Sequence, residues 1–177
     1  MSRLTPSDWG LYTTLQVVGA HDVGYVKYGG GMRFTNITIP KDTNIIEAHL
    51  TLHARYTRTA DVVNSRISAE DIDDAPTFAD SAAAFDTRWA ARTEAKVDWD
   101  AMPAWTANVD YDSPDIKAVI QEIVNREGWA SGQDIVIFWD DFDGRRTEAA
   151  GCRRDGYSYD KSTVFAPKLH IRYTAGS

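Results

Sequence analysis

Strict alternation between apolar and polar side chains over residues 46–56 is the feature that most constrains this chain. Isoleucine, leucine, alanine and tyrosine fall at every second position, and polar or charged residues fall between them. Such a period of two is typical of a β-strand with one face in a core and the other in water. Antiparallel sheets produce this pattern, because parallel sheets are usually covered on both faces.

Further segments carry strand patterns. Residues 63–69 and 169–173 alternate in the same way, and residues 135–139 are apolar on both faces, which predicts a central, covered strand. We expect shorter strands at residues 14–19, 32–39, 85–90, 94–99 and 147–153. Residues typical of turns separate these segments, at positions 29–31, 40–44, 73–76, 143–144 and 155–156. The alanine-rich residues 80–85 are consistent with a loop or a short helical turn.

One segment has helical periodicity. Ser113 is a typical N-cap residue, Pro114 suits the first helical position, Asp115 suits the first turn, and Gly128 suits the end of the helix. Between them, apolar residues recur at positions 116, 119, 120, 123 and 124, which predicts a covering helix over about residues 114–127. Many short strands and one helix predict an all-β sandwich of two antiparallel sheets. We expect residues 1–30 to hold an N-terminal segment with the first strands and residues 31–174 to hold the sandwich, as effectively one domain.

Length and charge exclude several classes of protein. The chain has 177 residues, room for one domain, and its net charge of −7 argues against binding to nucleic-acid phosphates. No apolar run reaches about 18 residues, so we expect no membrane insertion. The first residues lack the pattern of a signal peptide, which predicts that a chain starting at Met1 is not exported by the general secretory route. A single cysteine, Cys152, excludes an intramolecular disulfide and a multi-cysteine zinc site.

Five stretches, in order and together spanning about residues 31–173, resemble the DNRLRE-type, carbohydrate-binding-module-like jelly-roll domain. They are GMRFTNITIPKDTNIIEAHLTLHA, AEDIDDAPTF, VDWDAMPAWTA, SPDIKAVIQEIVNREGWASGQDIVIFW and YSYDKSTVFAPKLHIRY. The resemblance implies a jelly-roll β-sandwich without catalytic machinery, of a kind found in secreted prokaryotic proteins and in phage virion proteins. The stretch at residues 144–160 is longer and more charged than the family pattern, so ligand preferences of relatives do not transfer directly.

Acidic loops are candidate sites for calcium. Glu70, Asp71, Asp73 and Asp74 lie within five residues, and three aspartates crowd the turn at residues 140–143. Carboxylate oxygens at this density are suited to Ca²⁺, although neither loop has EF-hand spacing. The resemblance adds that jelly-roll modules often carry a structural calcium. The alternative is that these carboxylates are solvated or cap backbone amides in turns. No other cofactor is expected.

Aromatic residues divide into framework and surface candidates. Four tryptophans, in strand patterns or in the family-like stretches, are expected in the core: Trp99, Trp105, Trp129 and Trp139. The remaining candidates for contact with a saccharide or a protein partner are Trp9, Tyr12, Trp89, Tyr111, Tyr157 and Tyr159. Exposed aromatic rings serve both kinds of ligand, and the alternative is that these rings pack beneath loops.

The sequence contains no pattern of catalytic residues. It has neither a nucleophile elbow nor a phosphate-binding glycine loop. His49 and His53 are four residues apart, but on a strand that separation is about 13 Å, too far to share a metal ion. We therefore expect a non-catalytic structural or display module with protein neighbours in an oligomer or larger assembly, such as a decoration protein on the surface of a phage virion. The alternative is an extracellular carbohydrate-binding module, from a secreted enzyme or adhesin, that binds a polysaccharide. The genes that flank this one would separate the two.

Overall fold

The computed structural model describes residues 2–4, 8–10, 13–20, 27–59, 62–145 and 152–174. Within them, strands and short helices follow one another along the chain: β1 (Ser2–Leu4), β2 (Asp8–Gly10), β3 (Leu15–Ala20), β4 (Lys27–Ile37), β5 (Ile45–His53), β6 (Val63–Ala69), α1 (Ala82–Ala90), β7 (Val97–Met102), β8 (Asp110–Asp112), α2 (Lys117–Val124), β9 (Gln133–Asp140), β10 (Arg153–Tyr157) and β11 (Lys168–Tyr173). Neither helix has the length and hydropathy of a membrane span in the part of the chain described.

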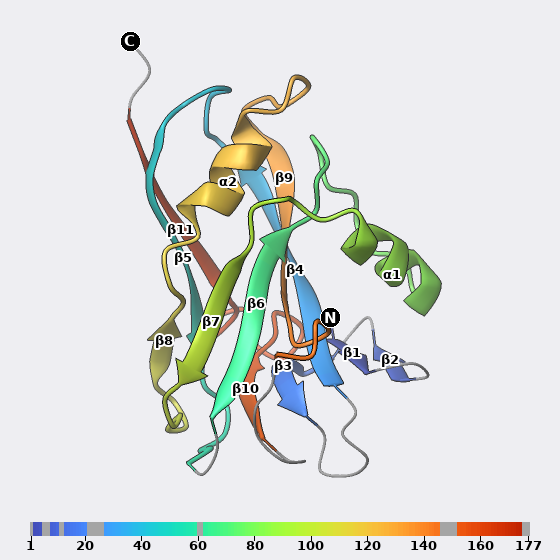
Figure 1. Ribbon diagram of the computed structural model, residues 1–177, viewed down its shortest axis with the longest axis vertical. Helices are drawn as coiled ribbons and strands as arrows, with labels where there is room; N and C mark the ends of the chain where they lie inside the picture. The colour runs from blue at the N-terminus through green and yellow to red at the C-terminus, as the bar shows by residue number, and fades with distance from the viewer. Residues whose placement is uncertain are drawn as a thin grey trace.

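The strands form two antiparallel sheets that face each other (Figure 1). The larger sheet has the order β10-β3-β4-β9-β6-β7, and a hairpin of β1 and β2 adds to β4. The smaller sheet has the order β11-β5-β8. The predicted all-β, jelly-roll-like sandwich is confirmed. The expected boundary between residues 30 and 31 falls inside β4.

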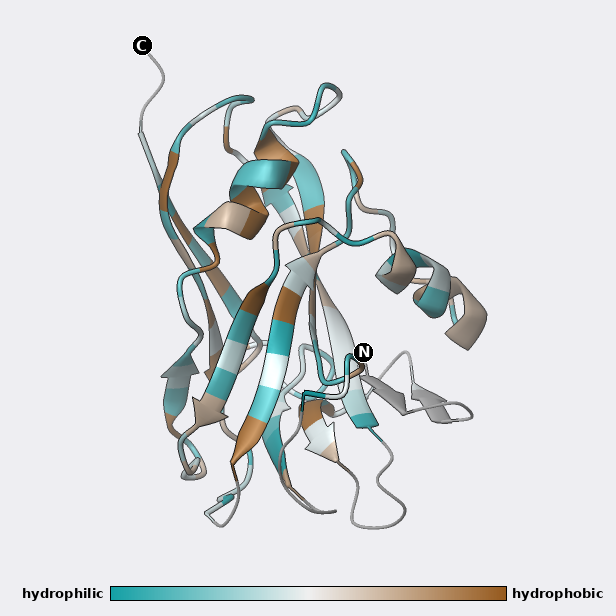
Figure 2. Ribbon diagram, in the orientation of Figure 1, coloured by the Kyte–Doolittle hydropathy of each residue, from teal (hydrophilic) through white to brown (hydrophobic). Residues whose placement is uncertain are grey.

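The core between the sheets follows from the alternation in the sequence. On β5, the side chains of Ala48, Leu50 and Leu52 are fully buried, as the period of two predicts. Along β6 and β7, hydrophobic residues alternate with hydrophilic ones (Figure 2). Strand β9 is buried along residues 135–140, as expected for a central strand.

Three of the expected core tryptophans form one cluster. The rings of Trp99, Trp105 and Trp139 lie 5.8 to 6.1 Å apart, between ring centroids. The indole Nε1 of Trp139 donates a hydrogen bond to Ser65 Oγ at 2.9 Å, which satisfies a polar atom in an otherwise apolar region. The fourth, Trp129, is buried and donates to the Ile39 carbonyl at 3.0 Å.

Helix α2 packs against β5 of the smaller sheet and β6 of the larger one. Ile120 and Ile123 enter the main core, as the helical spacing predicted. The helix is shorter than expected, and Ser113 is not its N-cap, because the Ser113 hydroxyl accepts a hydrogen bond from the Leu50 amide instead. Asp115 accepts hydrogen bonds from the amides of Lys117 and Ala48, and so joins the start of the helix to β5.

The strand predicted at residues 85–90 is wrong, because these residues belong to helix α1. The Ser81 hydroxyl accepts a hydrogen bond from the Ala84 amide, a typical N-cap contact. Phe85 and Trp89, four residues apart, lie on one helix face and pack with Phe138 of β9 and with Phe142 of the turn after it. Helix α1 therefore covers the larger sheet on the side away from the main core.

Two predicted turns are strand interior. Residues 29–31 belong to β4, and residues 155–156 belong to β10. At Gly31 the reason for glycine is close packing, since a Cβ atom there would lie 2.6 Å from the Phe78 ring. The strand expected at 147–153 begins only at Arg153, and residues 146–151 lie outside the described part.

Candidate functional site

The acidic loop is braced by arginines. Glu70 is buried and forms a two-pronged ion pair with Arg88, with bonds of 2.8 and 2.5 Å. Arg126, just after α2, donates to Asp71 and also to Asp73, the latter at 2.6 Å. These pairs join the loop to α1 and to the end of α2.

The geometry of this loop bears on the calcium prediction. The fourth carboxylate, Asp74, accepts a hydrogen bond from the Asp134 amide at 2.9 Å, as a turn-capping group would. A calcium ion at Asp71 and Asp73 would have to displace the Arg126 guanidinium. Among the residues described, no group of three or more histidine, cysteine, aspartate or glutamate side chains is arranged to hold a metal ion.

Trp89 is half-buried rather than a surface platform. Its Nε1 donates a hydrogen bond to Asp140 at 2.8 Å, and its ring meets the Phe142 ring edge-on. The Arg92 guanidinium lies 3.6 Å from the ring centroid, in cation–π contact. The Arg92 guanidinium therefore covers one face of the Trp89 ring.

Two more of the candidate aromatics, Tyr111 of β8 and Trp9 of β2, lie on strands. Tyr111 stacks on Trp105 with 4.8 Å between ring centroids, and its hydroxyl accepts from the Thr106 amide at 2.8 Å. Trp9 lies on β2, where its backbone pairs with Arg3 of β1. Tyr12 lies outside the described residues.

Residues 158–167, which connect β10 to β11, present apolar side chains to solvent. Tyr159 is 68% exposed and Val164 is 70% exposed, the highest values among the large hydrophobic residues described. The connection is held at both ends: the Ser158 hydroxyl donates to the Thr13 carbonyl, and the Phe165 ring stacks on His53 at 4.3 Å. We refer to residues 158–167 as the apolar loop. Sequence reasoning identified Tyr159 here but missed Val164 and Phe165, whose neighbours in the sequence give no sign that they are exposed.

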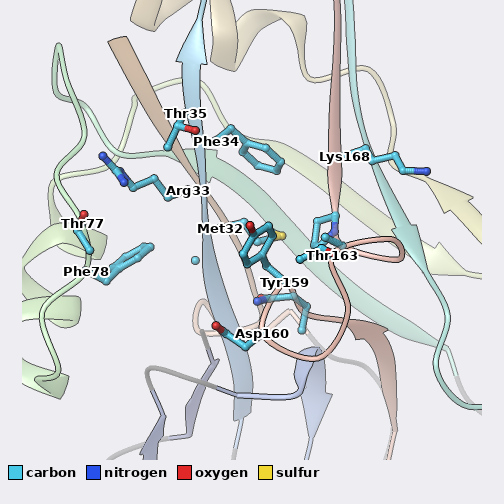
Figure 3. A pocket seen from close by; sticks show the side chains of 14 residues that line it. Met32, Arg33, Phe34, Thr35, Thr77, Phe78, Tyr159, Asp160, Thr163 and Lys168 are labelled. Carbon is cyan, nitrogen blue, oxygen red and sulfur yellow. The ribbon is translucent and has the colours of Figure 1, made fainter. Parts of the chain in front are cut away.

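A groove of about 610 Å³ lies between β4 and the apolar loop (Figure 3). Strand β4 runs through the middle of the view, with Thr77 and Phe78 on one side and Met32, Tyr159 and Thr163 on the other. Fourteen residues line it: Gln16, Gly31, Met32, Arg33, Phe34, Thr35, Thr77, Phe78, Tyr159, Asp160, Thr163, Ala166, Pro167 and Lys168. No pattern in the sequence indicates this groove, because its lining comes from four segments that are distant along the chain.

One wall of the groove is held by contacts of two arginines, Arg33 and Arg88. Arg33 donates to the Ala75 carbonyl at 2.8 Å and forms an ion pair with Asp134. The Phe78 ring lies beneath the Arg88 guanidinium, 4.1 Å from its centroid. The facing wall, by contrast, offers the exposed ring of Tyr159 together with the exposed Asp160. The groove thus combines apolar surface with a few polar groups, as ligand sites do.

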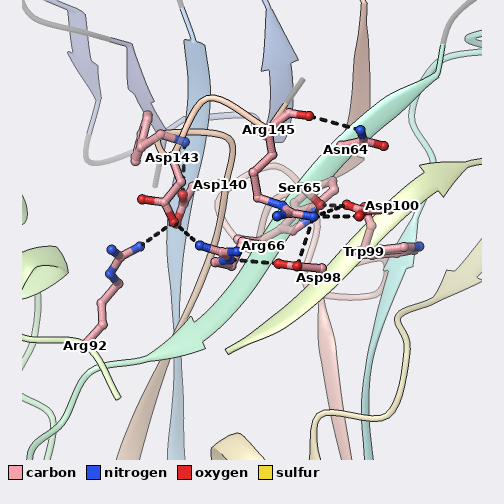
Figure 4. Close-up of polar contacts among 12 residues, drawn as sticks. Asn64, Ser65, Arg66, Arg92, Asp98, Trp99, Asp100, Asp140, Asp143 and Arg145 are labelled. Carbon is pink, nitrogen blue, oxygen red and sulfur yellow. Dashed lines mark hydrogen bonds and ion pairs between the residues drawn. The ribbon is translucent and has the colours of Figure 1, made fainter. Parts of the chain in front are cut away.

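A network of ion pairs fixes the chain after β9 onto β6 and β7 (Figure 4). Arg66 donates to Asp98 at 2.8 Å and to Asp143 at 2.9 Å, while Arg145 pairs with Asp98 at 2.9 Å and with Asp100 at 2.6 Å. Burial alone would raise the pKa of Asp143, but the hydrogen bond from Arg66 lowers it below its usual value. The Asp143 carboxylate of the second acidic turn therefore has structural partners in Arg66 and Arg92.

Asp140 has the most perturbed environment in this region. Its side chain is fully buried, and burial raises the pKa of its carboxyl group to about 6. Hydrogen bonds from Trp89 and from the Phe142 amide, at 2.8 and 3.1 Å, act in the opposite direction. The residue joins α1 to the end of β9 through these two contacts.

Cys152 and the histidines of β5 do not line the groove. Cys152 is buried and forms no disulfide. His49 stacks on His170 of the neighbouring strand at 4.8 Å, and His53 pairs with Asp110 at 2.5 Å. Both histidines of β5 thus have partners on the smaller sheet.

A comparison with protein-family models and with curated protein sequences found no match to this chain. The resemblance to the DNRLRE-type domain, beyond the sandwich fold itself, stays a prediction.

Proposed function

We propose that this protein is a non-catalytic β-sandwich module that presents surface to protein neighbours in a larger assembly, such as the surface of a phage virion. The observation that carries the proposal is the apolar loop. It exposes two large apolar side chains, Tyr159 and Val164, from a segment whose backbone is anchored by Ser158 and Phe165. Exposed apolar side chains on an ordered segment favour association. Their burial lowers the free energy, and little conformational entropy is lost because the segment is already ordered.

Incorporation into particles tests this proposal. In the organism that carries the gene, the tagged protein should sediment with assembled particles. The double variant Tyr159→Ser/Val164→Ser should remain in the soluble fraction, because it removes the apolar contact surface. The matched control is Tyr56→Ser/Val109→Ser, which changes two residues that are each 41% exposed elsewhere. The proposal fails if the Tyr159→Ser/Val164→Ser variant and the control sediment alike.

The second candidate function is saccharide binding, which the groove favours. Saccharide rings stack on aromatic faces while polar groups bind their hydroxyls, and Tyr159 lies beside Asp160 and Thr163 on one wall. On this alternative the isolated protein gives saturable hits on a glycan array, and Tyr159→Ala abolishes them while Tyr56→Ala does not. An array without hits excludes it.

A further inference from the structure

One of the two edges of strand β4 is paired over only part of its length. Strand β9 pairs with β4 from Gly29 onward, and β1 pairs with residues 28–30. Gly29 and Gly30 have partners in both strands, so β1 and β9 lie on opposite edges of β4. Among the described strands, none pairs with residues 31–35 on the edge that β1 uses.

The groove runs along this unpaired stretch. Its lining includes five consecutive residues of β4, Gly31 to Thr35, although successive side chains on a strand point to opposite faces. Residues from both faces can line one groove only where the groove follows the edge of the strand. Figure 3 shows this arrangement, with Arg33 on one side of the β4 ribbon and Met32 and Phe34 on the other.

Residues 31–34 of this edge lack the usual protection, and the bulge in the pairing of β4 with β9 begins only after Phe34. Exposed edges are commonly blocked by proline, by a bulge or by a charged side chain that deters pairing. Residues 31–35 contain no proline, and their one charged side chain, Arg33, is held by Asp134 and the Ala75 carbonyl. Just along the same edge, β1 already pairs with β4 in antiparallel fashion.

We propose that the groove accepts an extended polypeptide segment of a neighbouring protein, which pairs antiparallel with residues 31–35 of β4 in continuation of β1. This inference rests on the proposed function and names the surface and the kind of segment that binds it. Main-chain hydrogen bonds to the strand edge supply affinity, and alternate side chains supply specificity. Residues opposite Met32 and Phe34 face Tyr159, and residues opposite Gly31 and Arg33 face Phe78.

A tethered strand tests the edge without knowledge of the natural partner. Ser2 lies opposite Gly30, so the sequence Thr-Val-Thr-Val-Thr inserted between Met1 and Ser2 comes into register with residues 31–35, its valines beside Met32 and Phe34. The matched control, called the proline version, is Pro-Val-Pro-Val-Pro. Its prolines stand opposite residues 31, 33 and 35, where an inserted strand must donate its amides to this edge of β4, and proline lacks the amide donor.

Residue-resolved amide hydrogen exchange is the measurement. In the valine version, amides within residues 31–35 should exchange more slowly by at least about tenfold, and only at alternate positions, because every second residue bonds to a given edge. The proline version should exchange like the wild type. Equal exchange in the two versions overturns the inference.

Titration with a free peptide and with oligosaccharides distinguishes a polypeptide ligand from a saccharide ligand. The capped peptide Ac-Thr-Val-Thr-Val-Thr-NH2 at millimolar concentration should shift the same alternate amides of wild-type protein, and Tyr159→Ala should weaken this effect where Val109→Ala does not. Shifts at residues 31–35 from xylohexaose or cellohexaose, with none from the peptide, contradict the inference and favour the saccharide alternative. Strand pairing without incorporation into particles refutes the proposed function alone, and incorporation without strand pairing refutes this inference alone.

Discussion

The Nε1 atom of Trp89 donates a 2.8 Å hydrogen bond to Oδ2 of Asp140, a carboxylate with no exposed surface. This bond joins a helix on the outside of the larger sheet to the end of the central strand β9. The Arg92 guanidinium lies over the same indole, and its charge favours the ionised carboxylate. Trp89 therefore makes both a polar contact and an aromatic contact between α1 and the end of β9.

The pKa of Asp140 makes stability depend on pH in a defined window. Its value is about 6 in the folded protein against 3.8 ordinarily, so the folded state holds the proton more tightly. The free energy of unfolding should therefore fall by about 3 kcal/mol as the pH rises from about 4 to about 6, and then level off. Asp140→Asn cannot titrate and should lose this slope.

Urea unfolding at closely spaced pH values measures the free energy of unfolding of the wild type and of the Asp140→Asn variant. Asp143 supplies an internal reference of opposite sign, because its lowered pKa gives stability that is lost only as the pH falls below its usual range. Identical slopes for wild type and Asp140→Asn between about pH 4 and 6 would contradict the assignment.

Replacement of Trp89 tests the role of the hydrogen bond itself. Trp89→Phe keeps an aromatic ring against Phe142 but removes the donor to Asp140. We expect a loss of about 1–3 kcal/mol in unfolding free energy at neutral pH, since a buried acceptor loses its partner. The pKa of Asp140 should also rise further. Tyr159→Phe, at an exposed position, should leave both quantities unchanged; a Trp89→Phe variant as stable as wild type would show that α1 is held by other contacts.

Helix α2 is expected to be essential to the core. Ile120 is fully buried between β5 and β6, so Ile120→Asp would place an unpaired charge there and should cost several kcal/mol, a large part of a typical stability of about 5–15 kcal/mol. Ala118→Asp, on the exposed face of the same helix, is the matched control. Thermal unfolding measures the difference, and equal melting temperatures would mean that α2 is peripheral.

Calcium should have no effect on stability. The carboxylates of Asp71 and Asp73 already pair with Arg126, and an ion would stabilise the protein by mass action only if it bound there in preference to the guanidinium. Melting temperatures in EDTA and in millimolar CaCl₂ should coincide. A higher melting temperature with calcium would instead support the sequence-based prediction of a calcium site at Glu70, Asp71, Asp73 and Asp74.

The β-sandwich could be predicted because the patterns that indicate it lie within single segments of the sequence. Alternation along β5 and helical spacing at Ile120 and Ile123 report burial directly, and both patterns agree with the structure. Helix α1 was missed because alanine and aromatic residues fit a loop, a strand or a helix, and the outer sheet face that selects the helix is not visible in the sequence. The glycines of β4 were assigned to a turn for a similar reason, since the ring of Phe78 that requires Gly31 comes from a distant segment.

The candidate site was predicted in part. Tyr159 was identified as a surface aromatic, and it lines the groove. Trp89 and Tyr111 are grouped with it because residue type alone does not reveal their partners, Asp140 and Trp105. The groove depends on which edge of β4 stays unpaired, and strand order is a property of the whole fold rather than of any segment.

Site-specific photo-crosslinking tests the central claim most directly. A benzophenone amino acid placed at Val164, in the apolar loop, should give one discrete crosslinked product with a protein neighbour when cells are irradiated. The same amino acid at Val109, which is exposed on a different part of the surface, is the control. The account predicts a product that depends on position 164. The absence of any product at position 164, or the same products at both positions, would contradict it.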